Sequence, residues 1–181
     1  MGKRYNQLNE AQITFIKAQK LFFVGTAGPE GKVNISPKGM DSFRVLDSNK
    51  IIWLNVTGSG NETAAHLLLN DRMTIMFCAF EGKPSILRLY GNAKIYHERD
   101  TSFNTYLSMF PPLAGARQII EMNVDLIQDS CGMAVPFFDF KEERTHLNDW
   151  ATKQGKEKIE AYQLEKNTLS IDGFETKITE N

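Results

Sequence analysis

A short polar segment, Thr57-Gly-Ser-Gly-Asn-Glu-Thr63, follows a run of apolar residues and precedes a helical pattern. Its glycines allow the backbone to approach a ligand closely, while Ser59, Asn61 and Thr63 supply hydroxyl and amide groups for hydrogen bonds. The unpaired amides at the start of the following helix point toward the same place, and the helix dipole favours an anion there. The segment is therefore a candidate phosphate-binding site.

Two common phosphate-binding patterns do not fit this segment. A Rossmann fingerprint requires a third glycine where Asn61-Glu-Thr63 stands, and a P-loop requires Gly-Lys followed by Ser or Thr. A simpler alternative is a tight turn in which Ser59 or Asn61 only caps the helix, because such caps are common. The segment alone does not decide between these two roles.

Two basic residues elsewhere could complete an anion site. Lys38 lies in Ser36-Pro-Lys-Gly39, where a strand ends in a turn, and is either a solvated turn lysine or a partner for phosphate. Arg88 lies inside an apolar strand pattern and shares a predicted face with Ile86 and Tyr90. It either reaches an anionic ligand, pairs with an acid at an interface, or extends from a strand edge into solvent.

The composition limits the classes of partner. The chain has 181 residues, 41% apolar and 24% charged, which is enough to bury the core of one domain. Its net charge of -1 gives no basic excess for nucleic acid or anionic lipid, so we expect neither as a partner. No apolar run approaches the ~20 residues that span a bilayer, and the first residues lack the apolar segment of a secretory signal.

The cysteines and histidines suggest a reduced, metal-free protein. Cys78 and Cys131 both lie among apolar neighbours, which favours free thiols and a cytoplasmic location. His66, His97 and His146 are far apart and form no metal-binding motif. We expect His66 to face outward from its helix.

Strand patterns alternate with turn signals along most of the chain. Ile51–Val56 is almost continuously apolar, which predicts a strand buried on both faces, and Gly91 predicts a bulge. Long crossover helices are missing, so the pattern indicates an antiparallel barrel. Strands are expected at residues 21–26, 32–36, 43–46, 51–56, 73–80, 86–97 and 118–128, where Ile120, Met122, Val124 and Leu126 face one way. Helices are expected at 9–20, 63–69 and 101–109.

The composition becomes charged and helical from about residue 141. Apolar positions recur at helical spacing on both sides of Gly155, which predicts two short amphipathic helices. These helices cannot form a core of their own, so they must pack on the barrel or on a second subunit. We therefore divide the chain into a barrel domain at 1–140 and a C-terminal helical extension at 141–181.

The order of several short motifs resembles the pyridoxamine 5'-phosphate oxidase-like flavoproteins. These motifs are Asn34-Ile-Ser-Pro-Lys-Gly39, Phe43-Arg-Val-Leu46, Thr57–His66, Met76-Phe-Cys-Ala-Phe80 and Ile86-Leu-Arg-Leu-Tyr-Gly91. Later segments resemble the C-terminal extension of one subgroup: Asp129-Ser-Cys-Gly132, Val135-Pro136, Lys166-Asn167 and Ser170-Ile-Asp-Gly173. The resemblance implies a mainly β fold, a split β-barrel that forms a homodimer and binds FMN in two clefts between the subunits.

The resemblance also implies a set of cofactor-binding residues. It places the FMN phosphate at Thr57–Thr63, a basic residue near the phosphate or flavin at Lys38, and Arg88 in the strand that borders the isoalloxazine ring. The full set is Ser36, Lys38, Gly39, Val56, Thr57, Ser59, Gly60, Asn61, Thr63 and Arg88. No residue is identified as catalytic, and no metal ligand is expected.

The chain departs from pyridoxamine 5'-phosphate oxidase itself. Asn61-Glu62-Thr63 replaces the Ser-Arg-Lys pattern of that enzyme, and Trp150 matches its C-terminal tryptophan by residue type only. We therefore expect an FMN-dependent oxidoreductase that acts on an unidentified small molecule rather than on vitamin B6. The alternative is a non-catalytic module that holds flavin or haem for storage, sensing or electron relay; the deazaflavin F420 is also open. A cofactor-free protein would follow if Lys38, the Thr57–Thr63 segment and Arg88 did not converge.

Overall fold

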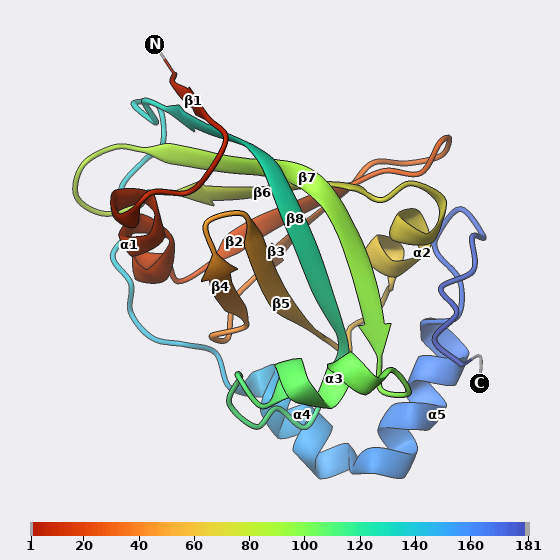
Figure 1. The fold of residues 1–181 in the computed structure, drawn as a ribbon. Coiled ribbons are helices and arrows are strands. Elements are labelled where there is room, and N and C mark those ends of the chain that lie inside the picture. The colour runs from red at the N-terminus through yellow and green to blue at the C-terminus, as the bar shows by residue number, and fades with distance from the viewer. Residues whose placement is uncertain (1, 180–181) are drawn as a thin grey trace.

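The computed structural model describes residues 2–179 as a curved antiparallel sheet with short helices around it (Figure 1). The outermost residues of the two predicted units, Met1 and 180–181, lie outside this range. The strands are β1 Arg4–Tyr5, β2 Phe22–Thr26, β3 Asn34–Lys38, β4 Phe43–Asp47, β5 Lys50–Val56, β6 Arg72–Cys78, β7 Ile86–His97 and β8 Ala116–Ser130. The helices are α1 Glu10–Ala18, α2 Glu62–Leu69, α3 Thr101–Leu107, α4 His146–Gln154 and α5 Lys156–Lys166.

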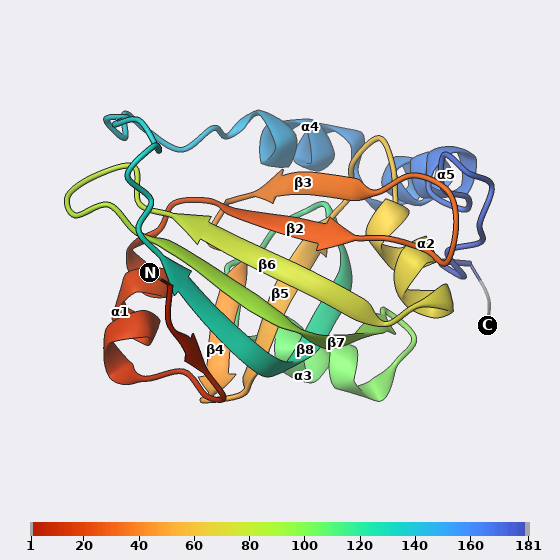
Figure 2. The ribbon, with the colours of Figure 1, turned by 90° about the horizontal axis from the view of Figure 1, so that it is seen from above.

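The strands form one ladder that curls into a split barrel. Its order is β3-β2-β6-β7-β8-β5-β4, and β1 pairs with the far end of β8. Figure 2 shows β2, β6, β7 and β8 side by side in this sheet, with α2 and α5 at one end. The predicted mainly β fold is confirmed, and the short strand β1 is an addition to it. No helix between residues 2 and 179 is long and apolar enough to cross a membrane.

Strand β5 is buried on both faces, as its apolar run predicts. Ile51 and Trp53 point into the barrel core. Ile52 and Leu54 face the other way and join a second apolar cluster that contains Phe103 of α3. Because both faces of β5 are covered, its carboxyl end and the loop that follows have a fixed position.

The predicted bulge at Gly91 is confirmed, and it corrects one core assignment. The pairing of β7 with β8 shifts between Tyr90 and Gly91, which leaves Asp125 of β8 without a partner in the register. A bulge reverses the alternation of side chains beyond it. Our placement of Leu126 on the same face as Val124 is therefore wrong, and Ile127 is the fully buried residue.

The C-terminal extension forms two helices that meet at Gly155, as predicted. Gly155 has a φ of 75°, a conformation that glycine adopts without strain. After α5, residues 167–179 run along the barrel beside α2 (Figure 1). This last segment, called the strap below, places chain-terminal residues next to the loop that follows β5.

The bulge gives a test of the register. A Cβ atom at Gly91 would lie 1.9 Å from the backbone oxygen of Asn123, whereas at Gly25 its nearest atom is the oxygen of Thr74 at 3.7 Å. Gly91→Ala should therefore lower the free energy of unfolding by about 3 kcal/mol or more. Gly25→Ala, the matched control, should change it by less than about 1 kcal/mol. Urea unfolding followed by tryptophan fluorescence measures both, and equal effects would contradict the register.

Candidate functional site

Strand β3 presents a polar row toward the interior of the split barrel. Asn34, Ser36 and Lys38 are partly buried, and they alternate with the exposed Ile35 and Pro37. The Asn34 amide donates hydrogen bonds to the hydroxyls of Thr26, at 3.2 Å, and Thr63, at 3.3 Å. This row therefore lies against the start of α2, where the sequence places the phosphate site.

Lys38 is a partly buried cation without a carboxylate partner. Its Nζ lies 5.3 Å from the centre of the Trp53 ring, and no Asp or Glu of residues 2–179 is within ion-pair distance. Burial, together with the positive charge of nearby Arg117, lowers the pKa of Lys38 to about 8. An anion beside Lys38 would reverse both effects.

Arg117 on β8 is a second cation at this place, and the sequence analysis missed it. The side chain is 6% exposed, and burial lowers its pKa to about 10. Nη1 donates to the Gly60 oxygen at 3.0 Å and to Asn167 Oδ1 at 2.6 Å. In the described chain no carboxylate pairs with it. The sequence feature that could have identified Arg117 is its place as a lone arginine at the start of an apolar strand.

The glycine-rich loop is held from behind by the C-terminal extension. The buried Thr57 hydroxyl donates to the Gly115 oxygen at 3.0 Å and accepts from Gln163 Nε2 at 2.7 Å. Asn167 Nδ2 donates to the Gly58 oxygen at 3.0 Å. Half-buried Val56 leads into this loop. The extension therefore fixes the loop from α5 and from the strap together.

Asn61 does not act as a simple helix cap. It precedes α2, but its side chain makes no capping hydrogen bond; instead Nδ2 donates to the backbone oxygen of Asn167 at 3.2 Å. Glu62 accepts from the backbone N–H of Ile171 at 3.1 Å. Since Asn61 is 2% exposed, the surface of the loop consists of Ser59 and the glycine backbone.

Of the ten predicted site residues, the structure brings nine to one region. They comprise the polar row with Gly39 and the loop from β5 to α2: Ser36, Lys38, Gly39, Val56, Thr57, Ser59, Gly60, Asn61 and Thr63. The side chains of Thr57, Asn61 and Thr63 already bond to protein atoms. They position the loop, and Ser59, Lys38 and the backbone amides remain to meet a ligand.

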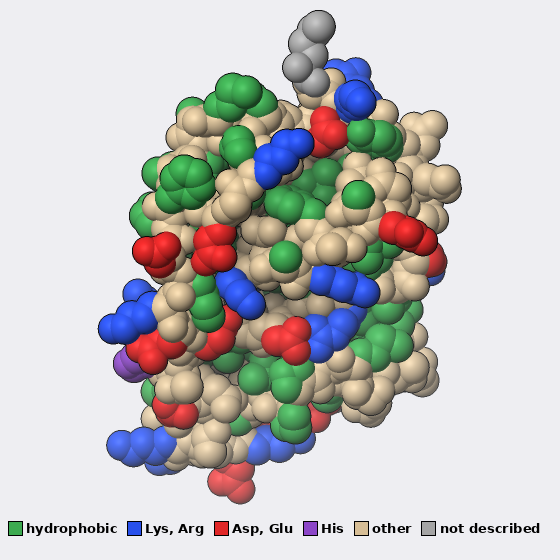
Figure 3. Space-filling view, turned by 90° about the vertical axis from the view of Figure 1, so that its left-hand side faces the viewer, with side chains coloured by type: hydrophobic (Ala, Val, Ile, Leu, Met, Phe, Trp, Pro, Cys, Tyr) green, Lys and Arg blue, Asp and Glu red, His purple; other side chains and the backbone are tan. Residues whose placement is uncertain are grey.

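The turn after Lys38 has an unusual backbone. Met40 and Asp41 have positive φ angles of 65° and 52°, which non-glycine residues rarely adopt. The turn is held by the Ser42 hydroxyl, which donates to the Gly39 oxygen at 2.6 Å, and by an Arg44–Asp41 ion pair at 2.7 Å. It borders a pocket of ≈ 290 Å³ between α1 and β4, on the side that appears hollowed in Figure 3. The turn therefore fixes the end of β3 that carries Lys38.

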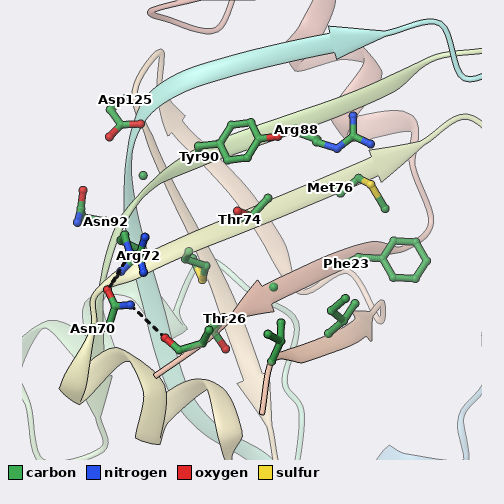
Figure 4. A pocket seen from close by; sticks show the side chains of 16 residues that line it. Phe23, Thr26, Asn70, Arg72, Thr74, Met76, Arg88, Tyr90, Asn92 and Asp125 are labelled. Atoms are coloured by element: carbon green, nitrogen blue, oxygen red, sulfur yellow. Dashed lines mark hydrogen bonds between the residues drawn. The ribbon is translucent and has the colours of Figure 1, made fainter. Parts of the chain in front are cut away.

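Arg88, the tenth predicted site residue, does not join the other nine. It shares the outer face of the sheet with Tyr90, as predicted, and its Nη1 donates to the Ser130 hydroxyl at 3.1 Å. Figure 4 shows Arg88 beside Tyr90 and Met76 in a pocket of ≈ 650 Å³. Lys38 pairs with the inward-facing Phe22. The sheet therefore separates Arg88 from Lys38 within one chain.

Four further residues were considered in the sequence analysis. His66 is buried with Nδ1 3.2 Å from the Thr26 hydroxyl, so the outward orientation expected for it is wrong. The helical pattern alone did not reveal that α2 packs against β2 along this side. Cys78 is buried and Cys131 exposed, both as free thiols. Trp150 contacts Tyr162 edge to face at 5.3 Å, which joins α4 to α5.

Comparison with known proteins gives one consistent result. A family model described as pyridoxamine 5'-phosphate oxidase matches residues 8–131. The chain is 33% identical to the pyridoxamine 5'-phosphate oxidase family protein ustO of Aspergillus flavus, over 94% of this chain and 76% of that protein.

Solved structures share the fold at lower identity. A candidate pyridoxamine 5'-phosphate oxidase from Lactobacillus delbrueckii is 20% identical with a TM-score of 0.55, over 68% of this chain and 94% of that one. The FAD binding protein of Mycobacterium smegmatis is 13% identical with a TM-score of 0.50, over 70% and 98%. At these identities the likeness extends to the fold alone.

The buried charge of Lys38 gives a stability test in ligand-free protein. Below about pH 8 both folded and unfolded chains keep the Lys38 proton, so the full cost of burying the charge is present. As the pH rises from about 8 toward 10.5, only the unfolded chain keeps it, and the wild type gains stability. Lys38→Met should therefore be more stable than wild type at pH 7, by about 2 kcal/mol.

The same measurement has a control and a contrary outcome. Lys83 is exposed in the turn before β7, so Lys83→Met should leave the free energy of unfolding within about 0.5 kcal/mol of wild type. The advantage of Lys38→Met should shrink as the pH rises. A Lys38→Met protein that is less stable than wild type at pH 7 would contradict the unpaired charge.

Proposed function

The chain belongs to the pyridoxamine 5'-phosphate oxidase family, and from this premise we propose that it is a flavoprotein that binds FMN through the flavin phosphate. One observation carries the proposal. Lys38 and Arg117 lie close enough for their charges to interact, beside the loop that contains Gly60, and neither has a carboxylate partner in residues 2–179.

A phosphate group suits this arrangement better than a neutral ligand. Two uncompensated cations in a partly buried site are costly, and a bound dianion offsets that cost. The Lys38 ammonium and the Ser59 hydroxyl would contact the phosphate, with backbone amides of the loop between them. Arg117, whose Nη1 is engaged by Gly60 and Asn167, would act mainly through its charge. The FAD binding protein of Mycobacterium smegmatis shares the fold, which supports a flavin.

The proposed activity is oxidation or reduction of a small molecule. FMN supplies hydride or electron transfer when it is bound, so the protein need only bind and orient its substrate. No two of the described residues near Lys38 form a general acid–base pair. This suits an enzyme in which the flavin carries the hydride or electrons and the protein binds the substrate. Anaerobic mixing with NADH or NADPH separates an enzyme from a passive flavin carrier, because only the enzyme would be reduced quickly.

The proposal includes a homodimer with the cofactor between the subunits. Arg88 and Lys38 face opposite sides of one sheet, so a site that uses both must take Arg88 from the partner copy. The outer face around Arg88 has the apolar character that such contact requires, because Val33 and Ile35 are 69% and 71% exposed there. Burial of this face would bring Arg88 against the cofactor of the other subunit.

The phosphate assignment predicts a difference between two flavins. Purified protein should be yellow with about one FMN per chain, and it should bind FMN more tightly than riboflavin, which lacks the phosphate. Lys38→Met should weaken FMN binding about tenfold or more and riboflavin binding little, whereas Lys83→Met should change neither. Flavin fluorescence titration measures all four affinities. Colourless protein that takes up no added FMN would rule out the proposal.

Mixing of subunits tests the shared site. Lys38→Met and Arg88→Met proteins should each bind FMN weakly. If Arg88 acts on the partner's cofactor, a heterodimer of the two variants contains one site with both residues intact. Unfolding and refolding the two together should then restore tight binding at about a quarter of the sites, because about half of the dimers are mixed. No recovery would contradict a site shared between two copies.

A further inference from the structure

A second pocket lies at the end of the barrel, under the C-terminal helices. Helices α3, α4 and α5 gather where β7 ends and β8 begins (Figure 1), and they enclose a pocket of ≈ 450 Å³. Much of its wall is apolar, formed by Phe103, Leu107, Ala114, Ala116, Ala151 and Ile159. A volume of this size lies within the range of small-molecule sites, which is about 300–1,000 Å³.

Arg117 gives this pocket a buried positive charge. Its side chain is among those that line the pocket and is 6% exposed. Nη1 is already used by Gly60 and Asn167, but Nε is buried without a hydrogen-bond partner. A buried donor of a charged group is costly to leave unpaired. Nε has almost no accessible surface, so Arg117 acts on the pocket mainly through a positive charge that lacks an anionic acceptor.

The acidic residues of the pocket do not supply that acceptor. Glu98 and Glu160 belong to the lining, but they are exposed and pair with Lys156 at 3.0 Å and 3.7 Å. Their charges are thus partly offset at the mouth of the pocket. The interior keeps the charge of Arg117, with mostly apolar side chains and the polar side chains of His97 and Gln163 around it.

We propose that this pocket binds a small organic anion with an apolar body, of the class of aromatic or branched aliphatic carboxylates. The carboxylate lies against the wall that Arg117 forms and offsets its charge, and the apolar body packs on Phe103 and Ile159. This ligand is distinct from a flavin phosphate, which would lie at Lys38 and the loop surface. The two sites share Arg117 as a neighbour, but the proposal holds whether or not the protein binds FMN.

Binding of 2-naphthoate, compared with its neutral amide 2-naphthamide, tests the proposal. The titrations use the full chain saturated with FMN where it binds, so that the probe cannot occupy the flavin site. The carboxylate should bind about tenfold or more tightly than the amide, because only the carboxylate is a charged acceptor. Nuclear Overhauser contacts should connect the naphthalene protons to the methyl groups of Ala151 and Ile159.

A variant that fills the pocket avoids disturbing Arg117, whose bonds also hold the loop. Thr152 lies on α4 at the pocket and is exposed, so Thr152→Phe should fold normally and weaken 2-naphthoate binding about tenfold or more. Thr105→Phe, on an exposed position of α3 outside the pocket, is the matched control and should bind as wild type does. Equal affinities for the two probes, full binding by Thr152→Phe, or no binding at all would overturn the proposal.

Discussion

The burial of one arginine without an acid beside it governs the arrangement of this end of the molecule. Arg117 can remain charged in the interior only because the oxygens of Gly60 and Asn167 accept from it. One acceptor belongs to the glycine-rich loop, and the other is Asn167, the first residue of the strap. The same guanidinium therefore fixes both segments and raises the potential at Lys38. Removal of the charge would release the loop, the extension and the ligand site together.

The alternation of side chains across the sheet divides the remaining functional residues. Lys38 follows Asn34 and Ser36 on the inner face of β3, while Arg88 and Tyr90 lie on the outer face of β7. The two faces have different surroundings. The inner row meets α2 of its own chain through Asn34, whereas the outer face carries exposed apolar side chains, among them Val33 and Ile35. This division is the reason for proposing a site shared between two copies.

The sequence was informative wherever local pattern decides the outcome. The apolar run of β5, the bulge at Gly91 and the break at Gly155 each depend on a few adjacent residues. The errors have longer-range causes. Leu126 was placed on the wrong face because the bulge opposite Gly91 reverses the alternation of side chains along β8. The extra residue of the bulge lies in β8, and the sequence of β8 alone does not show where it is.

Contacts between distant segments were not predictable from one sequence. The role of Arg117 depends on Asn167, which comes fifty residues later in the chain, and nothing local connects them. The same contact has a consequence for biosynthesis. The loop can reach its final form only after Asn167 has left the ribosome, 109 residues behind Gly58. A nascent barrel would thus be unable to hold the proposed ligand until the strap has been synthesised, which makes ligand capture follow the completion of the strands in each new molecule.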